Sequence, residues 1–152
     1  EYDISPFGLE AQRILRLEKG HIIVGQDTDA LSTPFHLNMD WVVRLEKSDF
    51  VGRGGLVTVQ EQGVRDKLVC FTMDEDVVPE DGDPVLDQGK PVGKVTSSRL
   101  SPTTGKGFGL VWLPVEMTKE RTKISIRVDG SDALGVVTGQ PLYDPESNKL
   151  RD

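Results

Sequence analysis

A change of sequence character after Arg65 constrains the fold most. From there on, short runs rich in β-branched residues are separated by clusters of Gly, Pro and Asp, a pattern typical of strands joined by tight turns. Several short strands at regular spacing predict a small β-barrel or a β-sandwich. The expected strands cover residues 67–73, 84–86, 90–97, 108–113, 123–128 and 134–138, with turns at residues 79–83, 87–90, 104–107 and 129–132.

The preceding segment predicts helices instead. Ser5-Pro6 is a typical helix start, and apolar residues then recur at near-helical spacing until Gly20, a typical helix end. We therefore predict an amphipathic helix over residues 6–19. A second helix is expected over residues 53–62.

Two further segments complete this first part. Residues 21–24 resemble a short β-strand, and residues 37–45 resemble a strand or a buried turn. So few elements bury little apolar area, and we expect residues 1–65 to be the end of an incomplete α/β domain whose partner layer lies upstream or in another subunit. Residues 66–152 are expected to form a second, all-β domain. The first residue is Glu1 rather than Met, which favours a piece cut from something longer.

Charge and cysteine content narrow the class of protein. The formal net charge is −7, which argues against nucleic acid and anionic membranes as partners. We find no apolar stretch long enough to span a bilayer. Cys70, the single cysteine, lies in the apolar run 68–71 and is expected to be a small buried side chain. One cysteine suits a reducing compartment, so we expect a cytoplasmic protein.

No motif in the sequence points to catalysis or metal binding. Residues 105–109 (GKGFG) lack the spacing of a phosphate-binding loop and predict a tight turn. His21 and His36, the two histidines, have no well-spaced carboxylates beside them, so we expect no metal site. The sequence contains no nucleophile elbow. We therefore assign no catalytic residue to this chain.

Charged and aromatic side chains offer weaker signals. Arg13, Arg16 and Glu18 share a predicted helix and favour a solvated face with local ion pairs, with an anion clamp as the alternative. Trp41 and Trp112 could each stack on a flat ring, but are more typical of core positions.

An ordered set of motifs resembles the glycine-cleavage aminomethyltransferase family. Residues 11–20 (AQRILRLEKG) are similar to the family's A-x-x-x-L-R-L-E-x-G helix, and the matches keep their order to about residue 143. The further matches lie at residues 25–29, 32–34, 41–43, 49–53, 92–97, 101–103 and 111–114.

The resemblance implies a fold of class α+β: a C-terminal fragment of a folate-binding aminomethyltransferase-like domain, followed by a small antiparallel β-barrel. It implies tetrahydrofolate as cofactor, with Gln12, Arg16, Glu18 and Trp41 as candidate folate-binding residues. The family's catalytic aspartate and pterin-binding glutamate lie upstream of this sequence. We therefore expect the chain alone to be inactive and folate to be shared with the upstream polypeptide or other subunits.

Finer detail is similar to one branch. Residues 16–29 resemble the large subunit of heterotetrameric sarcosine oxidase, and residues 142–146 resemble its tail, so the natural C-terminus is expected to be present. This branch implies that an N-methyl amine is oxidised by a flavin elsewhere, and that tetrahydrofolate takes the one-carbon unit. FAD and NAD would then bind only in missing regions or partner subunits.

Departures from the family patterns leave alternatives. Glycine-cleavage enzymes have Arg-Asp where this chain has Gln12-Arg13, and that arginine approaches folate. Folate-binding iron–sulfur maintenance proteins have a signature cysteine at the place of His21, which argues against that class. A non-catalytic folate-binding or subunit-docking module remains the alternative to an enzyme part.

Overall fold

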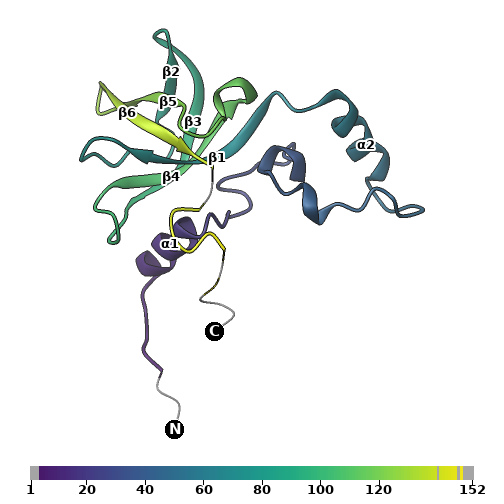
Figure 1. The fold of residues 1–152 in the computed structure, drawn as a ribbon, viewed down its shortest axis with the longest axis horizontal. Coiled ribbons are helices and arrows are strands. Elements are labelled where there is room, and N and C mark those ends of the chain that lie inside the picture. The colour runs from purple at the N-terminus through teal and green to yellow at the C-terminus, as the bar shows by residue number, and fades with distance from the viewer. Residues whose placement is uncertain (1–3, 140, 147, 149–152) are drawn as a thin grey trace.

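The computed structural model describes residues 4–139, 141–146 and 148. It contains a closed β-barrel and the helix α1 (Leu9–Glu18) against it. A lateral arm runs from the 3₁₀-helix Asp40–Val42 to the end of α2 (Arg53–Gln62). Figure 1 shows the arm reaching away from the barrel on one side, with α1 below the barrel. The expected class, α+β with a small antiparallel barrel after a helical segment, is confirmed.

Six antiparallel strands close the barrel in the order β1-β4-β3-β2-β5-β6. β1 pairs with both β4 and β6, so the sheet closes on itself and the sandwich is ruled out. Closure pairs the edges that an open sheet would expose. The strands are β1 (Asp66–Met73), β2 (Pro84–Asp87), β3 (Lys90–Leu100), β4 (Gly107–Pro114), β5 (Lys123–Val128) and β6 (Ser131–Thr138).

Tight hairpins make some strands longer than predicted. Asp129 and Gly130 have positive φ values of 49° and 81°, as a two-residue type I′ turn requires. β6 therefore starts at Ser131, ahead of the predicted start at residue 134. Asn, Asp and Gly tolerate this left-handed conformation, which explains why the turn itself was visible in the sequence.

The barrel interior is the main hydrophobic core. Alternate residues of β5 point inward, as shown by Ile124 and Ile126, because successive side chains of a strand face opposite sides. A Cβ atom at Gly109 would lie 1.9 Å from the Ser97 carbonyl oxygen, so glycine allows β3 and β4 their close approach. The buried core residues are Phe71, Met73, Val85, Val95, Val111, Leu113, Ile124, Ile126, Ala133 and Val137.

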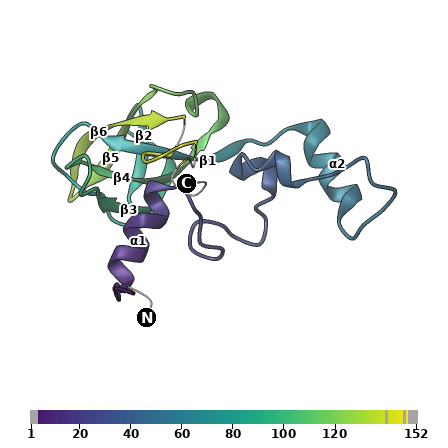
Figure 2. The same cartoon turned by 60° about the horizontal axis from the view of Figure 1, so that its bottom comes forward.

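A second, smaller core attaches α1 to the outside of the barrel. Leu17 of α1 packs with Leu68, Phe108 and Leu110, and the partly buried Cys70 joins this cluster. α1 lies against β3 and β4, and Figure 2 shows it crossing beneath these strands. The helix is thus held by one apolar stripe, as expected of an amphipathic helix.

The start of α1 differs from the prediction. The helix begins at Leu9 with Gly8 as N-cap, and no side chain caps it. Ser5 therefore does not serve as the predicted N-cap. Phe7 is exposed, so the segment before Leu9 makes few packing contacts that would stabilise another helical turn.

Two other segments in the first part were predicted wrongly. Residues 21–23 are irregular and residues 24–27 form a turn, so the predicted strand is absent; Asp27 accepts the Ile23 backbone N–H in place of a strand partner. Residues 40–42 form a 3₁₀-helix, and Trp41 is 75% exposed, so neither a strand nor a buried turn is present there.

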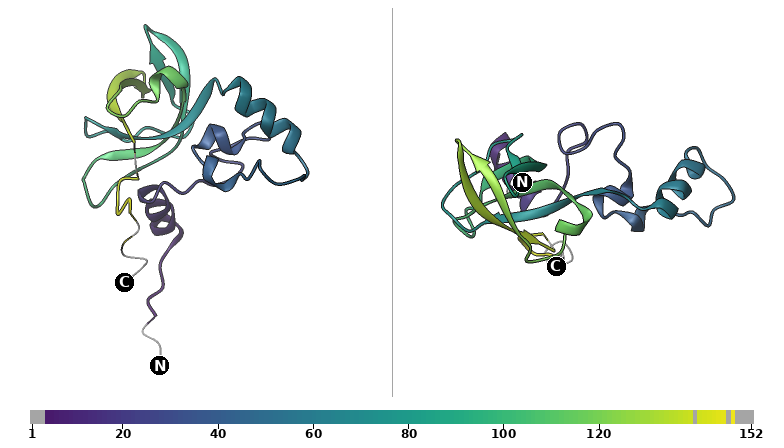
Figure 3. Two further views of the ribbon diagram at one scale, coloured as in Figure 1. Left: turned by 45° about the vertical axis from the view of Figure 1, so that its right-hand side comes forward. Right: turned by 90° about the horizontal axis from the view of Figure 1, so that it is seen from above.

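The arm has little packing of its own. α2 has the predicted bounds and ends at the C-cap Gly63, but none of its residues is buried. Figure 3 shows the arm projecting from the barrel in both views. The proposed division at residues 63–66 stays a prediction, although β1 begins at Asp66. In the described part of the chain, no helix is long and apolar enough to cross a membrane.

Candidate functional site

Asp27 is the centre of a buried polar cluster between α1 and the barrel. It follows α1 in the chain and is 1% exposed. A buried carboxylate needs several donors, because removing its charge from water is otherwise costly. Its donors are Arg16 Nη1 (2.7 Å), the Ile23 backbone N–H (2.7 Å), Thr96 Oγ1 (2.8 Å) and Ser97 Oγ (2.5 Å). We call Arg16, Asp27, Thr96 and Ser97 the Asp27 cluster.

Further hydrogen bonds connect this cluster to its surroundings. Arg16 Nη1 also donates to the His21 carbonyl at 3.0 Å, and Nη2 donates to Ser97 Oγ at 2.7 Å. Trp112 on β4 donates from Nε1 to the Asp27 carbonyl at 2.8 Å. The cluster therefore fixes the loop after α1 relative to both β3 and β4.

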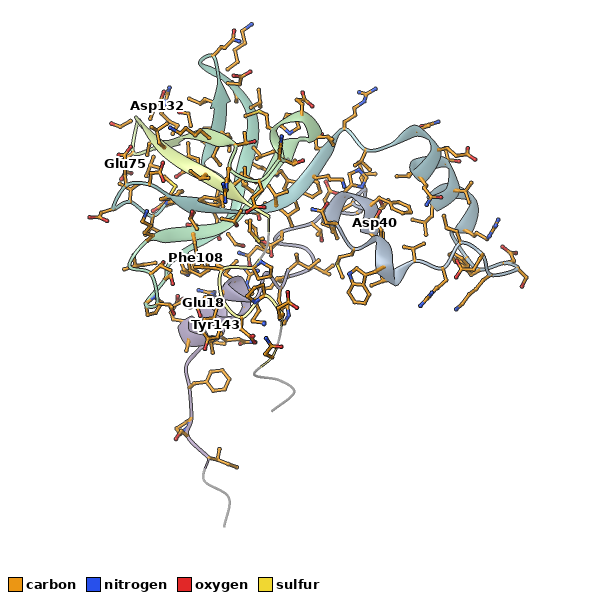
Figure 4. All side chains as sticks on the ribbon, viewed as in Figure 1. Glu18, Asp40, Glu75, Phe108, Asp132 and Tyr143 are labelled. Atoms are coloured by element: carbon orange, nitrogen blue, oxygen red, sulfur yellow. The ribbon has the colours of Figure 1, made fainter. Side chains whose placement is uncertain are left out.

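Glu18 forms a second buried contact at the end of α1. It is 5% exposed, and its Oε1 accepts hydrogen bonds from Ser101 Oγ and Thr103 Oγ1, both at 3.1 Å. The backbone N–H of Tyr143 donates to the Glu18 carbonyl at 3.0 Å. Figure 4 shows Glu18 and Tyr143 close together beneath Phe108. The last turn of α1 is thus joined to the turn after β3 and to the C-terminal segment.

The four predicted folate-binding residues do not share one place. Gln12 has an exposed side chain on α1. Arg16 belongs to the Asp27 cluster, and Glu18 is buried beside Ser101. Trp41 lies in the arm. Two of the four are therefore open to a ligand, and two have their polar groups engaged within the chain.

The expected solvated face of α1 is present only in part. Arg13 forms a local ion pair with Glu10 at 2.6 Å, as the helical spacing predicts. Arg16 is not solvated, because its guanidinium reaches the buried Asp27 instead. An anion clamp made of Arg13 and Arg16 is therefore not formed.

Two grooves lie beside these contacts. The Trp112 groove, of about 600 Å³, is lined by residues 25–29, Leu31, Ser32, His36, Asp66, residues 91–94, Thr96 and Trp112. The Trp41 groove, of about 730 Å³, is lined by residues 20–22, 37–39, Trp41, residues 67–70, Leu110, Val115, Thr118, Thr138, Gly139 and Pro141. Trp41 thus has a groove beside it, as a stacking residue requires, whereas Gln12 lines neither groove.

His36 and Trp112 face each other in the Trp112 groove. Their ring centroids are 6.1 Å apart with an interplanar angle of 62°, an edge-to-face arrangement. His36 Nδ1 accepts the Thr33 backbone N–H at 3.1 Å, so in the neutral ring Nε2 carries the proton. Trp112 is only partly buried, so the expectation that it is a core residue holds for part of its surface.

Sequence reasoning missed the partners of Arg16. Asp27 lies in the family match at residues 25–29, and no contact with Arg16 was predicted for it. A usable signal lies in β3, where Thr96, Ser97 and Ser98 are consecutive polar residues and are all buried. Polar residues on both faces of a strand indicate that something other than the core covers the outer face.

Titratable groups give no sign of a catalytic nucleophile or metal centre in the part of the chain that the structure describes. Burial raises the pKa of the Cys70 thiol to about 11, so the thiolate is scarce at neutral pH. Among the described residues, no group of three or more His, Cys, Asp or Glu side chains could hold a metal ion.

Similarity to known proteins agrees with this architecture. The fold is that of a C-terminal barrel domain preceded by a helical segment. The model of the glycine cleavage T-protein C-terminal barrel domain matches residues 67–144, and that of the GCVT N-terminal domain matches residues 1–47. The chain belongs to the glycine cleavage T-protein family.

Individual relatives are longer than this chain. It is 37% identical over 141 residues to an aminomethyltransferase of Rippkaea orientalis, covering 92% of this chain and 38% of the relative. It is 35% identical over 159 residues to a probable aminomethyltransferase of Pyrococcus furiosus, covering 99% of this chain and 40% of the relative. The glycine cleavage system aminomethyltransferase T of Bartonella henselae superposes with a TM-score of 0.86 at 25% identity, covering 91% of this chain and 39% of that one. The chain spans about two fifths of the length of these relatives.

Proposed function

We propose that the chain is the C-terminal part of a tetrahydrofolate-dependent aminomethyl-transfer domain. The observation that carries this proposal is the fit of nearly the whole chain to aminomethyltransferases, including the TM-score of 0.86 to the Bartonella henselae protein. The chain contributes a structural wall of the folate pocket rather than the reacting groups. By itself it is inactive, and the acid, base and pterin-binding groups come from upstream sequence or other subunits.

Within this wall, the four candidate residues divide by exposure. Trp41 is exposed beside a groove and stacks on a flat ring of folate. Gln12 is exposed on α1 outside both grooves, and its amide contacts folate only in the pocket that the upstream polypeptide completes. Arg16 and Glu18 are engaged in buried contacts and act as positioning residues for α1. Tetrahydrofolate accepts the one-carbon unit when it is bound.

We assign the parent to the sarcosine oxidase α type. The support is the sequence of residues 16–29, which resembles that subunit. In such a parent, a flavin bound outside this chain would supply the oxidation of an N-methyl amine, and tetrahydrofolate would take up the one-carbon unit. The products are 5,10-methylenetetrahydrofolate and the free amine. FAD and NAD bind outside this chain.

A subunit-docking module is the second candidate. Its support is a set of exposed apolar side chains in the first part of the chain. A single exposed apolar residue is ordinary, whereas a group of them is typical of an interaction surface. Under this alternative the chain binds protein rather than folate. These side chains are Ile4, Phe7, Leu9, Leu15, Ile23, Val24, Leu31, Trp41, Val42 and Val51.

Isothermal titration calorimetry of 5-formyltetrahydrofolate tests the proposal. The titration is made against this chain and against a longer polypeptide that adds the upstream region of the parent protein. We expect binding by the longer polypeptide only, weakened about tenfold by Trp41→Ala and retained in Trp41→Phe, because phenylalanine can still stack. Binding by neither polypeptide would contradict the proposal and favour the docking module.

A further inference from the structure

Asn38 lies where the chain leaves the barrel for the arm. It is the C-cap of the 3₁₀-helix Pro34–Leu37, which packs against β1. Its backbone is left-handed, with φ 55° and ψ 32°, a conformation that asparagine and glycine tolerate better than most residues. The arm begins two residues later, at Asp40. The conformation of Asn38 therefore sets the direction in which the chain enters the arm.

The side chain of Asn38 fixes this point of exit on β1. Its Nδ2 donates to the Leu68 carbonyl at 3.1 Å, and its Oδ1 accepts from Lys67 Nζ at 3.0 Å. β6 pairs with β1 only over residues 70–73, and Asn38 gives the Leu68 carbonyl a partner beyond that pairing. Both ends of the amide are thus engaged on two consecutive residues of one strand.

The arm itself has no polar contact with the barrel. None of residues 40–64, all of which the structure describes, forms a hydrogen bond or ion pair with a barrel strand. Their contacts are internal, as when Arg53 Nε donates to the Leu45 carbonyl. α2 contributes no buried residue either. The two bonds of Asn38 are therefore the polar anchor of Trp41, which lies three positions further along the chain.

These bonds also join two walls of the Trp41 groove. Residues 37–39 and Trp41 line the groove from the first segment, and residues 67–70 line it from β1. Asn38 belongs to the first set and bonds to residues of the second. Trp41 is 75% exposed, so its own burial does not hold it in place. Stacking is strongest on an indole that is already in position, because ordering a mobile side chain on binding costs free energy.

We infer that Asn38 is the positioning residue for Trp41, holding the indole beside the groove so that it can stack on a planar ligand. That this ligand is folate rests on the proposed function, in which Trp41 stacks on a flat ring. Without the Asn38 contacts, the indole is still present but moves with the arm. Ligand binding then weakens although the stacking ring is unchanged.

The first measurement follows Trp41 in this chain without any ligand. The chain has two tryptophans, so 5-fluorotryptophan gives two ¹⁹F signals, and Trp41→Phe identifies the signal of Trp41. Asn38→Gly removes both side-chain contacts and keeps the left-handed backbone accessible. We expect this variant to narrow and shift the Trp41 signal, because the indole becomes more mobile, and to leave the Trp112 signal in place. An unchanged Trp41 signal would overturn the inference.

The second measurement is calorimetry of 5-formyltetrahydrofolate with the longer polypeptide. Asn38→Gly should weaken binding about threefold to tenfold, as expected for the loss of about one net hydrogen bond. In a Trp41→Ala background the same substitution should have little further effect, because Asn38 acts through Trp41. Full additivity of the two losses would show that Asn38 acts independently of Trp41 and would overturn the positioning role.

Further variants separate the side-chain contacts from the backbone conformation. Asn38→Asp keeps the size of the side chain but cannot donate to the Leu68 carbonyl, so it should weaken binding as Asn38→Gly does. Lys67→Met removes only the contact to Oδ1 and should have a smaller effect. Asp129→Gly is the matched control, since Asp129 is also left-handed, with φ 49°, but lies in the turn between β5 and β6. It should change neither the Trp41 signal nor the affinity, and circular dichroism establishes that each variant is folded.

The two measurements distinguish this inference from the proposed function. A mobile Trp41 in Asn38→Gly, with no folate binding by the unsubstituted longer polypeptide, would reject the proposed function and support the positioning role. Folate binding that Asn38→Gly and Asn38→Asp leave unchanged would keep the proposed function and overturn the inference. An effect of Asp129→Gly as large as that of Asn38→Gly would also overturn it.

Discussion

The barrel and the first segment, residues 4–65, bury their side chains in opposite ways. The barrel encloses ten buried apolar residues, whereas α2 in the arm has no buried residue at all. The preceding segment attaches to the barrel through a small apolar cluster together with buried polar contacts centred on Asp27 and Glu18. A closed sheet satisfies its own hydrogen bonds and fills its own interior, while short helices need a neighbour to cover them.

This difference indicates which contacts define each region. Apolar burial is non-directional and holds the barrel together. Ion pairs and hydrogen bonds require fixed geometry, so the contacts of Asp27 set where α1 and its loop lie on the barrel. We expect substitutions in the barrel core to affect the whole fold, and substitutions at Asp27 to affect the docking of the first segment.

Removal of one aromatic side chain from each region gives the largest contrast. Phe71→Ala, at a site that is 1% exposed, should lower the free energy of unfolding by about 3–5 kcal/mol because it leaves a cavity. Trp41→Ala, at a site that is 75% exposed, should change it by less than about 0.5 kcal/mol. Urea denaturation followed by circular dichroism measures both. Equal losses at the two sites would mean that the arm is buried in solution.

The polar contacts that hold the loop after α1 on the barrel can be weakened by changing one atom of Asp27. Asp27→Asn keeps the size of the side chain but leaves the guanidinium of Arg16 without its carboxylate, at a cost of about 3 kcal/mol. Trp112 fluorescence, measured in a Trp41→Phe background, reports this loss because Trp112 donates to the Asp27 carbonyl. Asp132→Asn, in the exposed pair with Arg127, is the control and should cost less than about 1 kcal/mol. A similar small cost for Asp27→Asn would show that the first segment is held by its apolar contacts alone.

Cys70 reports the contact between the two regions through its pH dependence. It lies beneath Gly20, and burial raises the pKa of its thiol from 9.0 to about 11. The folded chain keeps this proton at pH values where the unfolded chain has lost it. The contribution of Cys70 to stability is therefore fully present below pH 9 and is lost as the pH rises from 9 to 11. Over this window the free energy of unfolding should fall by up to about 3 kcal/mol.

Denaturation curves between pH 8 and pH 11 measure this effect, with Cys70→Ala as the variant in which the same decrease should disappear. The rate of thiol modification adds a second measurement. It should be slow in the folded chain at pH 8 and should increase in Asp27→Asn, where the first segment is less firmly docked. If the free energy of unfolding of the unsubstituted chain and of the Cys70→Ala variant changed identically with pH, a raised thiol pKa would be contradicted.

Local sequence signals predicted the barrel better than the segment before it. The alternation of Ile124 and Ile126 and the turn at residues 129–132 depend on neighbours within a few residues, so these features were visible in advance. The strand expected at residues 21–24 was wrong, because Asp27, which Thr96 and Ser97 hold from far along the chain, accepts the Ile23 backbone N–H. The strand or buried turn expected at residues 37–45 was wrong, because residues 40–42 form a 3₁₀-helix in which Trp41 is exposed. The candidate site shows the same limit: Arg16 was selected from its motif, but its partner Ser97 lies 81 positions away.

The sequence by itself determined the family, the class of fold, the bounds of α2 and the approximate position of every barrel strand. These depend on periodicity, turn residues and motif order, which are properties of short stretches of chain. Only the tertiary structure decided that the sheet closes, that Arg16 pairs with the buried Asp27, that Glu18 is buried, and that Arg13 meets Arg99 at Glu10. Such contacts arise from the packing of α1 on β3 and β4, and no local pattern encodes which side chains that packing brings together.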